Sequence, residues 1–186
     1  MTAAFRFCPM CATALRDIVA DEDGGAKSRP RCPACGWTHW NNPTPVLAAV
    51  IEMADQGGRL LIARNAAWPE GTYGLVTGFM EADETPEDGI RREVAEETSL
   101  DVRSLALIGV YDFQRMNQLI VAYHAVAAGE VKLSPELVDH RLVEPAKMRC
   151  WRAGTGFALA DFLKSRGFEP QWFDRPPIQP RPPSTP

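Results

Sequence analysis

The sequence has no apolar run of the roughly 18 residues that a membrane-spanning helix requires. Its first residues, MTAAFRFCPMC, also lack the apolar core of a secretory signal peptide. We therefore expect a chain that does not cross a membrane and works in the cytoplasm, where thiols stay reduced. Five cysteines in that compartment favour metal binding or chemistry over disulfides.

Basic side chains are not in excess, because 20 Lys and Arg residues oppose 24 Asp and Glu residues. A net charge of -4 gives no general attraction to the phosphates of nucleic acids. The apolar share of 45% and the charged share of 24% are those of a globular protein. The length of 186 residues accommodates one ordinary domain and a small module.

The composition divides the chain into three predicted parts, residues 1–42, 43–170 and 171–186. In the middle part, short runs rich in β-branched or aromatic residues predict strands at 46–53, 59–63, 72–77, 105–111 and 119–127. Residues 157–166 have the apolar spacing of a helix. This order predicts an α/β fold with a mixed sheet. The last part ends in RPPIQPRPPSTP, which predicts a disordered tail, with a ligand for a proline-reading domain as the alternative.

Four cysteines form two CxxC pairs, Cys8 with Cys11 and Cys32 with Cys35. Each pair can bring two thiolates to one ion, and two pairs complete a tetrahedron. We therefore predict one structural Zn²⁺ ion in residues 1–42; an iron–sulfur cluster is the alternative. Because protein fills all four positions, this ion would fold the segment rather than bind substrate.

Residues 78–100, GFMEADETPEDGIRREVAEETSL, carry eight carboxylates and no lysine. Thr85 and Pro86 predict the start of a helix, with acidic residues in its first turn. On that helix Glu93, Glu96 and Glu97 would lie within an arc of roughly 100°. A solvated acidic face is the alternative, but it usually includes interspersed lysines. The pattern favours a site for Mg²⁺ or Mn²⁺ shared with substrate phosphates.

The spacing from Gly78 through Glu84 to Arg92-Glu93 and Glu96-Glu97 resembles the Nudix box, GX5EX7REUXEEXGU, in which U is aliphatic. Of its fixed positions only one differs, since Ser99 stands where the box has glycine. That glycine ends the helix in a left-handed turn, so we expect Ser99 to cost about 1 kcal/mol without removing a metal ligand. The resemblance implies a Nudix α/β/α sandwich with a mixed sheet, preceded by a zinc ribbon.

The resemblance also implies roles for individual residues. It implies two or more Mg²⁺ or Mn²⁺ ions held by Glu93, Glu97, the Gly78 carbonyl and Glu136, with Glu96 as ligand or base. Arg92 would orient the glutamates. Phe79 would lie against a nucleobase, and Trp40 would stack on the substrate from a partner subunit or else pack between ribbon and domain. Tyr111 and Phe113 could stack on a base, although alternate aromatic residues on a strand more often belong to the core.

The four-cysteine ribbon before the box resembles that of the NADH pyrophosphatase group, but the SQPWPFP motif of that group is absent. We therefore expect hydrolysis of a nucleoside diphosphate linked to X, of the NAD(H), ADP-ribose or FAD type, with release of a nucleoside monophosphate. The expected partners are a small nucleotide and a second subunit in a homodimer, and no nucleic acid except a capped RNA end. The alternative is a non-catalytic nucleotide sensor whose ribbon binds nucleic acid or protein.

Overall fold

The computed structural model describes residues 5–174. It divides the chain into two compact units, with the boundary between Pro43 and Thr44. Among the described residues, neither helix has both the length and the apolar character needed to span a membrane.

The first unit is a small β ribbon with almost no core. Strands β1 (Arg16–Glu22) and β2 (Gly25–Arg31) form an antiparallel hairpin, and bridges from Phe7 to Ala14 and from Arg31 to Thr38 join the flanking turns. Within residues 5–43 the only buried side chains are those of Cys8 and Cys32. Apolar burial therefore contributes little to the stability of this unit.

The second unit is built on a six-stranded mixed sheet. Its strand order is β6 (Asp101–Phe113), β7 (Gln118–Ala128), β3 (Thr44–Met53), β4 (Arg59–Asn65), β8 (Leu137–Val143), and β5 (Val76–Phe79) pairs with β3 beside β4. Strands β3 and β7 are parallel, and all other pairs in this sheet are antiparallel. A short parallel pair, β9 (Arg149–Trp151) with β10 (Gln171–Phe173), and two 3-10 turns, Gln114–Met116 and Pro145–Lys147, complete the unit.

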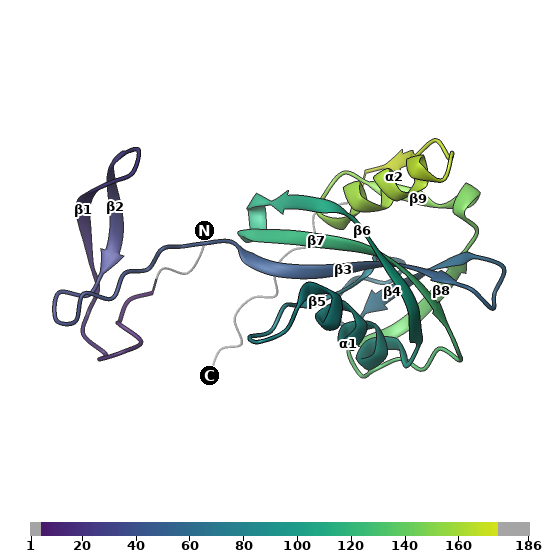
Figure 1. Cartoon of the computed structure of the whole chain (residues 1–186), viewed down its shortest axis with the longest axis horizontal. Coiled ribbons are helices and arrows are strands. Elements are labelled where there is room, and N and C mark those ends of the chain that lie inside the picture. Colours follow the sequence, from purple (N-terminus) through teal and green to yellow (C-terminus); the bar gives the residue numbers. More distant parts are fainter. Residues whose placement is uncertain (1–4, 175–186) are drawn as a thin grey trace. The chain divides into compact units, whose positions relative to one another are not determined.

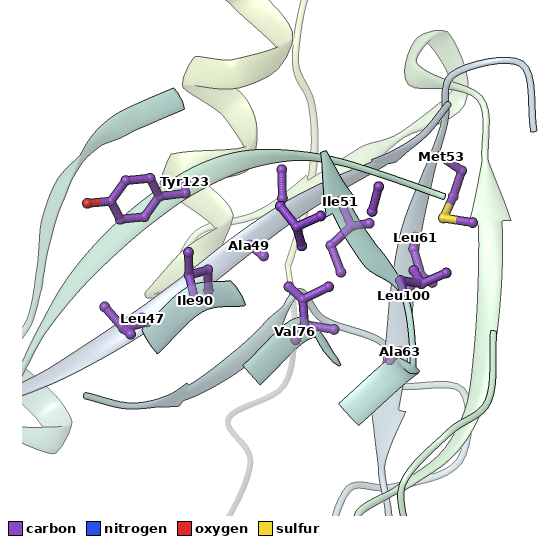
Figure 2. Packing of buried hydrophobic residues seen from close by; sticks show 14 of the residues in the cluster. Leu47, Ala49, Ile51, Met53, Leu61, Ala63, Val76, Ile90, Leu100 and Tyr123 are labelled. Atoms are coloured by element: carbon purple, nitrogen blue, oxygen red, sulfur yellow. The ribbon is translucent and has the colours of Figure 1, made fainter. Parts of the chain in front are cut away.

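Helices α1 (Pro86–Thr98) and α2 (Thr155–Ser165) cover opposite faces of this sheet (Figure 1). The alternation of side chains along β3 explains the arrangement. Leu47, Ala49 and Ile51 lie in the cluster under α1, together with Ile90 (Figure 2). The intervening residues of β3 lie in clusters that contain α2 residues. Because both faces are covered, the strand is continuously apolar from Val46 to Ile51 rather than alternating.

The predicted α/β fold with a mixed sheet between helices is confirmed. The predicted tail begins too early, because Gln171–Phe173 form β10. Trp172 and Phe173 pack against the apolar cluster that holds Trp151, which keeps this stretch on the second unit. Residues 175–186 lie outside the described residues, and so does the rest of the tail prediction.

Candidate functional site

Helix α1 begins and ends as the acidic stretch predicts. The Thr85 hydroxyl accepts a hydrogen bond from the Asp88 N–H at 3.1 Å, and Pro86 occupies the first helical turn. At the other end Ser99 adopts a left-handed conformation, with φ 59°, and its N–H donates to the Ala95 carbonyl. The serine therefore makes the turn for which the Nudix box uses glycine.

Arg92 holds the acidic residues around it together. Its guanidinium donates to both oxygens of Glu84, at 3.1 and 2.9 Å, to Glu93 at 2.8 Å and to Glu96 at 3.1 Å. A further N–H donates to the backbone carbonyl of Phe79 at 3.2 Å. These bonds raise the pKa of Arg92 and lower that of Glu84, for which the Arg92 hydrogen bond is the largest cause. One cation thus ties α1 to the loop that precedes it.

Gly78 lies directly against the carboxyl group of Glu93. A β-carbon at position 78 would overlap that carboxyl group, so no larger residue fits without moving Glu93. The register explains the contact, since Gly78 pairs with Leu47, whose side chain faces α1. Gly89 fills a similar role that sequence reasoning missed, because a β-carbon there would meet Glu84 and Leu47. Only the packed structure shows these contacts, since Gly78 is known from the sequence only as a box position and Gly89 only as a glycine within the predicted helix.

Glu97 is a carboxylate in an unfavourable environment. It is 9% exposed, and it forms no side-chain hydrogen bond or ion pair within residues 5–174. Burial, followed by repulsion from Glu93, Glu136 and Glu96, raises its pKa to about 7. Burial also raises the pKa of Glu93, although Arg92 acts in the opposite direction. A cation beside Glu97 would offset both the burial and the repulsion.

Glu136 is brought to the same end of α1 by the loop before β8. The Lys132 N–H donates to the Thr98 carbonyl at 2.9 Å, and the Ser134 N–H donates to the Glu97 carbonyl at 3.0 Å. The side chain of Glu136 is exposed, and its charge is among those that raise the pKa of Glu97. The structure therefore brings together Glu93, Glu97 and Glu136, which are 43 residues apart in the chain at their extremes.

Among the aromatic candidates, Phe79 is the most open. It is 59% exposed at one end of a cross-strand row that continues through Val46 and Ile120 to Tyr111. Tyr111 and Phe113 pack against the apolar cluster beside α2, and the Tyr111 hydroxyl donates to Asp161 at 3.0 Å. Trp40 belongs to the first unit, where the Arg29 guanidinium lies 5.2 Å from its ring centroid. Substrate stacking by these four residues stays a prediction.

The four ribbon cysteines converge as their spacing predicts. Their sulfur atoms all lie within 4.8 Å of one another, and the Cys8–Cys35 and Cys11–Cys32 sulfur pairs are each 3.5 Å apart. Backbone N–H groups of Met10 and Cys35 point at the sulfurs of Cys8 and Cys32. This donor set fits a tetrahedral Zn²⁺ ion. The fifth cysteine, Cys150, is fully buried in the second unit, where burial raises its pKa to about 11, as expected of a packed thiol.

Within residues 5–174, these cysteines are the only group that brings three or more ligand atoms so close together. The glutamate oxygens lie farther apart, and Arg92 bonds two of those side chains. The donor set of carboxylates and a backbone carbonyl is nevertheless the one that Mg²⁺ and Mn²⁺ prefer. The buried Glu97, which has no cation partner among the described residues, fits such an ion as well.

A family model of the NUDIX domain matches residues 43–164, well over half of the chain. The chain therefore belongs to the Nudix family, and the resemblance drawn from its box is confirmed. The solved structure of a NUDIX hydrolase from Nitrosomonas europaea has the same fold, with a TM-score of 0.70 at 22% sequence identity. That similarity covers 92% of this chain and all of the other.

Two curated relatives carry the name NAD-capped RNA hydrolase. NudC of Stutzerimonas stutzeri is 29% identical over 135 residues, which are 72% of this chain and 46% of that protein. NUDT12 of Macaca fascicularis is 30% identical over 150 residues, which are 77% of this chain and 30% of that protein. The chain thus spans less than half the length of these relatives.

Proposed function

We propose that the chain is a Mg²⁺- or Mn²⁺-dependent pyrophosphohydrolase. It cleaves the diphosphate of a nucleoside diphosphate linked to X, of the NAD(H), ADP-ribose or FAD type, and releases a nucleoside monophosphate. The observation that carries this proposal is the convergence of Glu93, Glu97 and Glu136 beside Gly78, with Glu97 buried and lacking a cation partner among the described residues. Membership of the Nudix family supports it.

The proposed site divides its work between holding metal and holding carboxylates. The proposed ligands of two or more ions are Glu93, Glu97, Glu136 and the Gly78 carbonyl. Glu96, whose side chain is more exposed than that of Glu93, is a ligand or base. When bound, such ions neutralise charge on the phosphates and lower the pKa of a bound water. Arg92 fixes the directions of Glu93 and Glu96 and keeps Glu84 beside them.

The substrate would extend from the carboxylates toward the face of the sheet that α2 covers. Phe79 connects the two regions, because its backbone carbonyl accepts from Arg92 while its exposed ring begins the row that leads to Tyr111. We propose that a nucleobase stacks on Phe79, with Tyr111 and Phe113 as the wall of its site. Trp40 is a second stacking candidate, offered by a partner subunit as the family resemblance implies.

The names of the relatives put NAD-type ends of RNA among the substrates to test. The absence of the SQPWPFP motif leaves the order of preference between NADH, ADP-ribose and FAD to experiment.

We also propose one Zn²⁺ ion at the four cysteines, a homodimer by analogy with the family, and a cytoplasmic location. A non-catalytic sensor is the less favoured function, because the carboxylates of the box are complete.

The test compares the native chain with a Glu96→Gln, Glu97→Gln variant in Mg²⁺ or Mn²⁺. The substrates are NADH, NAD⁺, ADP-ribose, FAD, diadenosine polyphosphates and an NAD-capped RNA, with products resolved by mass. We expect the native chain to release AMP from the free nucleotides and to convert the capped RNA into nicotinamide mononucleotide and a 5′-monophosphate RNA. The variant should be slower by a factor on the order of 10³, since metal ligation supplies several kcal/mol of transition-state stabilisation. Nucleotide binding without any turnover would reject hydrolysis and favour the sensor.

A further inference from the structure

Strand β8 contains an irregularity directly after Glu136. In its pairing with β4, Leu137 lies opposite Asn65 and Asp139 lies opposite Arg64, so that Val138 is an extra residue. Such a bulge reverses the alternation of side chains along a strand. Leu137 consequently packs into the core under α1, whereas Asp139 shares its side of the sheet with Arg64. The bulge determines how the chain leaves the loop that carries Glu136.

The Asp139 carboxylate is held on both of its oxygens. One oxygen accepts from the His140 N–H at 2.8 Å, and the other accepts from the hydroxyl group of Tyr73. Tyr73 is 8% exposed, and the Arg141 guanidinium lies 4.2 Å from its ring centroid. A buried hydroxyl bonded to a carboxylate makes a strong and directional contact.

Tyr73 and Asp139 lie along opposite edges of strand β4. Gly74 forms a bridge with Ala63 of β4, with mutual N–H to carbonyl hydrogen bonds of 2.9 Å, which puts Tyr73 beside Arg64. Asp139 flanks Arg64 on the other edge, in β8. The Tyr73–Asp139 bond therefore spans β4, and it joins the segment that leads into Gly78 to the bulge that follows Glu136.

The hydrogen bonds of Glu136 are made by its backbone, one of them to the residue that follows β4. Its carbonyl accepts from the Ala66 N–H at 2.8 Å, and its N–H donates to the Ser134 hydroxyl at 3.3 Å, while its side chain is exposed. The direction of that side chain is thus set by the backbone on both sides of it. Before Glu136, this backbone is the loop that is hydrogen-bonded to the end of α1. After Glu136, it is the Val138 bulge of β8.

We propose that Tyr73 and Asp139 are positioning residues: their hydrogen bond holds the Val138 bulge and thereby directs Glu136 toward Glu97. This inference rests on the proposed function for its kinetic readout. Neither residue belongs to the Nudix box, and Tyr73 is 63 residues before Glu136. The bond acts through β8 rather than by contact with substrate.

The test is a double-mutant cycle of Tyr73→Phe and Glu136→Gln in the full chain. Tyr73→Phe keeps the ring and its contact with Arg141 and removes only the hydroxyl. We expect it to lower kcat about tenfold in the native background, as loss of a residue that orients a metal ligand does, and by less than twofold when Glu136 is already Gln. The Mn²⁺ concentration for half-maximal rate should rise in the same non-additive way.

Tyr123→Phe is the matched control. It also removes one buried hydroxyl bonded to a carboxylate, that of Glu87 at 2.8 Å. Tyr123, however, lies on β7, which does not pair with β8, and Glu87 lies in the first turn of α1. Its effect should be the same with Glu136 or Gln at position 136. Equal effects of Tyr73→Phe in both backgrounds would show a merely structural bond and overturn the proposal.

The same double-mutant cycle also has a readout that does not depend on catalysis, namely the rise in Tm that Mn²⁺ causes. If the native chain hydrolyses nothing on the panel, the proposed function fails, but this second readout still decides the positioning role. A smaller rise in Tyr73→Phe than in the native chain, with no difference in the Glu136→Gln background, supports it. An unchanged rise, or none in the native chain, overturns it.

Discussion

The ribbon and the second unit each bring candidate metal ligands together, but they do so in opposite ways. The four cysteine sulfurs lie within 4.8 Å of one another, in a unit whose only buried described side chains are Cys8 and Cys32. The glutamates lie farther apart on a helix that is capped, packed and held by Arg92. In the first case the ligands are the core of the unit, and in the second a complete core carries the ligands.

This difference teaches what each metal does in the proposed enzyme. A closed set of four thiolates leaves no position for substrate, so its ion serves folding. A dispersed set of carboxylates leaves positions that phosphate oxygens and water can fill. Removing the first ion should therefore affect structure, and removing the second should affect activity and only part of the stability.

The largest expected effect follows loss of the ribbon ion. Treating the full chain with a zinc-selective chelator should unfold residues 16–31, because binding of such an ion supplies on the order of 10 kcal/mol and apolar burial there is slight. Amide hydrogen exchange should show rapid exchange in β1 and β2 with β3 to β7 still protected. Continued protection of β1 and β2 in zinc-free protein would refute a structural role for the ion.

The next effect concerns the metal response of the second unit. Mn²⁺ at about 100 times its Kd should stabilise the native unit by about 2.7 kcal/mol, which is a rise in Tm of roughly 5–10 °C. Glu93→Gln with Glu97→Gln should abolish that rise, because two proposed ligands are gone. A Glu130→Gln, Glu144→Gln variant loses the same charge from exposed positions and should respond like the native chain. A rise that survives the first pair of substitutions would place the metal elsewhere.

A smaller effect tests the contact between Gly78 and Glu93. The methyl group of Gly78→Ala would displace the Glu93 carboxyl group, so we expect activity to fall about 10- to 100-fold while zinc content stays the same. In a Glu93→Ala background the carboxyl group that the methyl group would overlap is absent, so Gly78→Ala should cost much less. Steady-state kinetics of the native chain and the three variants decides this, and equal costs in both backgrounds would contradict the contact.

Local chemistry made much of the site predictable from the sequence. The cap at Thr85, the proline after it and the carboxylates at helical spacing all act within one helix, and so do the buried positions Ile90 and Val94. The cysteine pairs are equally local, since each CxxC closes its own turn. Even Ser99 is intelligible from the sequence, because a helix that ends there needs a left-handed residue whatever its type.

The remaining features depend on pairing between distant strands. The prediction missed β8, β9 and β10, which are short or contain polar residues, and it placed the start of β5 four residues too early. Neither the Val138 bulge nor the bond from Tyr73 to Asp139 has a sequence signal, since both arise from register. For Tyr111 the sequence left base stacking and core packing open, and its packing against the cluster beside α2 follows from its row across the sheet.

The most direct test of the division between the two metal sites is to measure AMP release by protein that retains zinc but has lost its other metals. The native chain would be exchanged into metal-free buffer, with native mass spectrometry confirming one zinc ion for each chain. We predict no release of AMP in that state and full recovery on addition of Mg²⁺ or Mn²⁺ alone. Release that persists with zinc as the only metal, or that recovers only when zinc is added, would contradict the assignment of catalysis to the glutamate site.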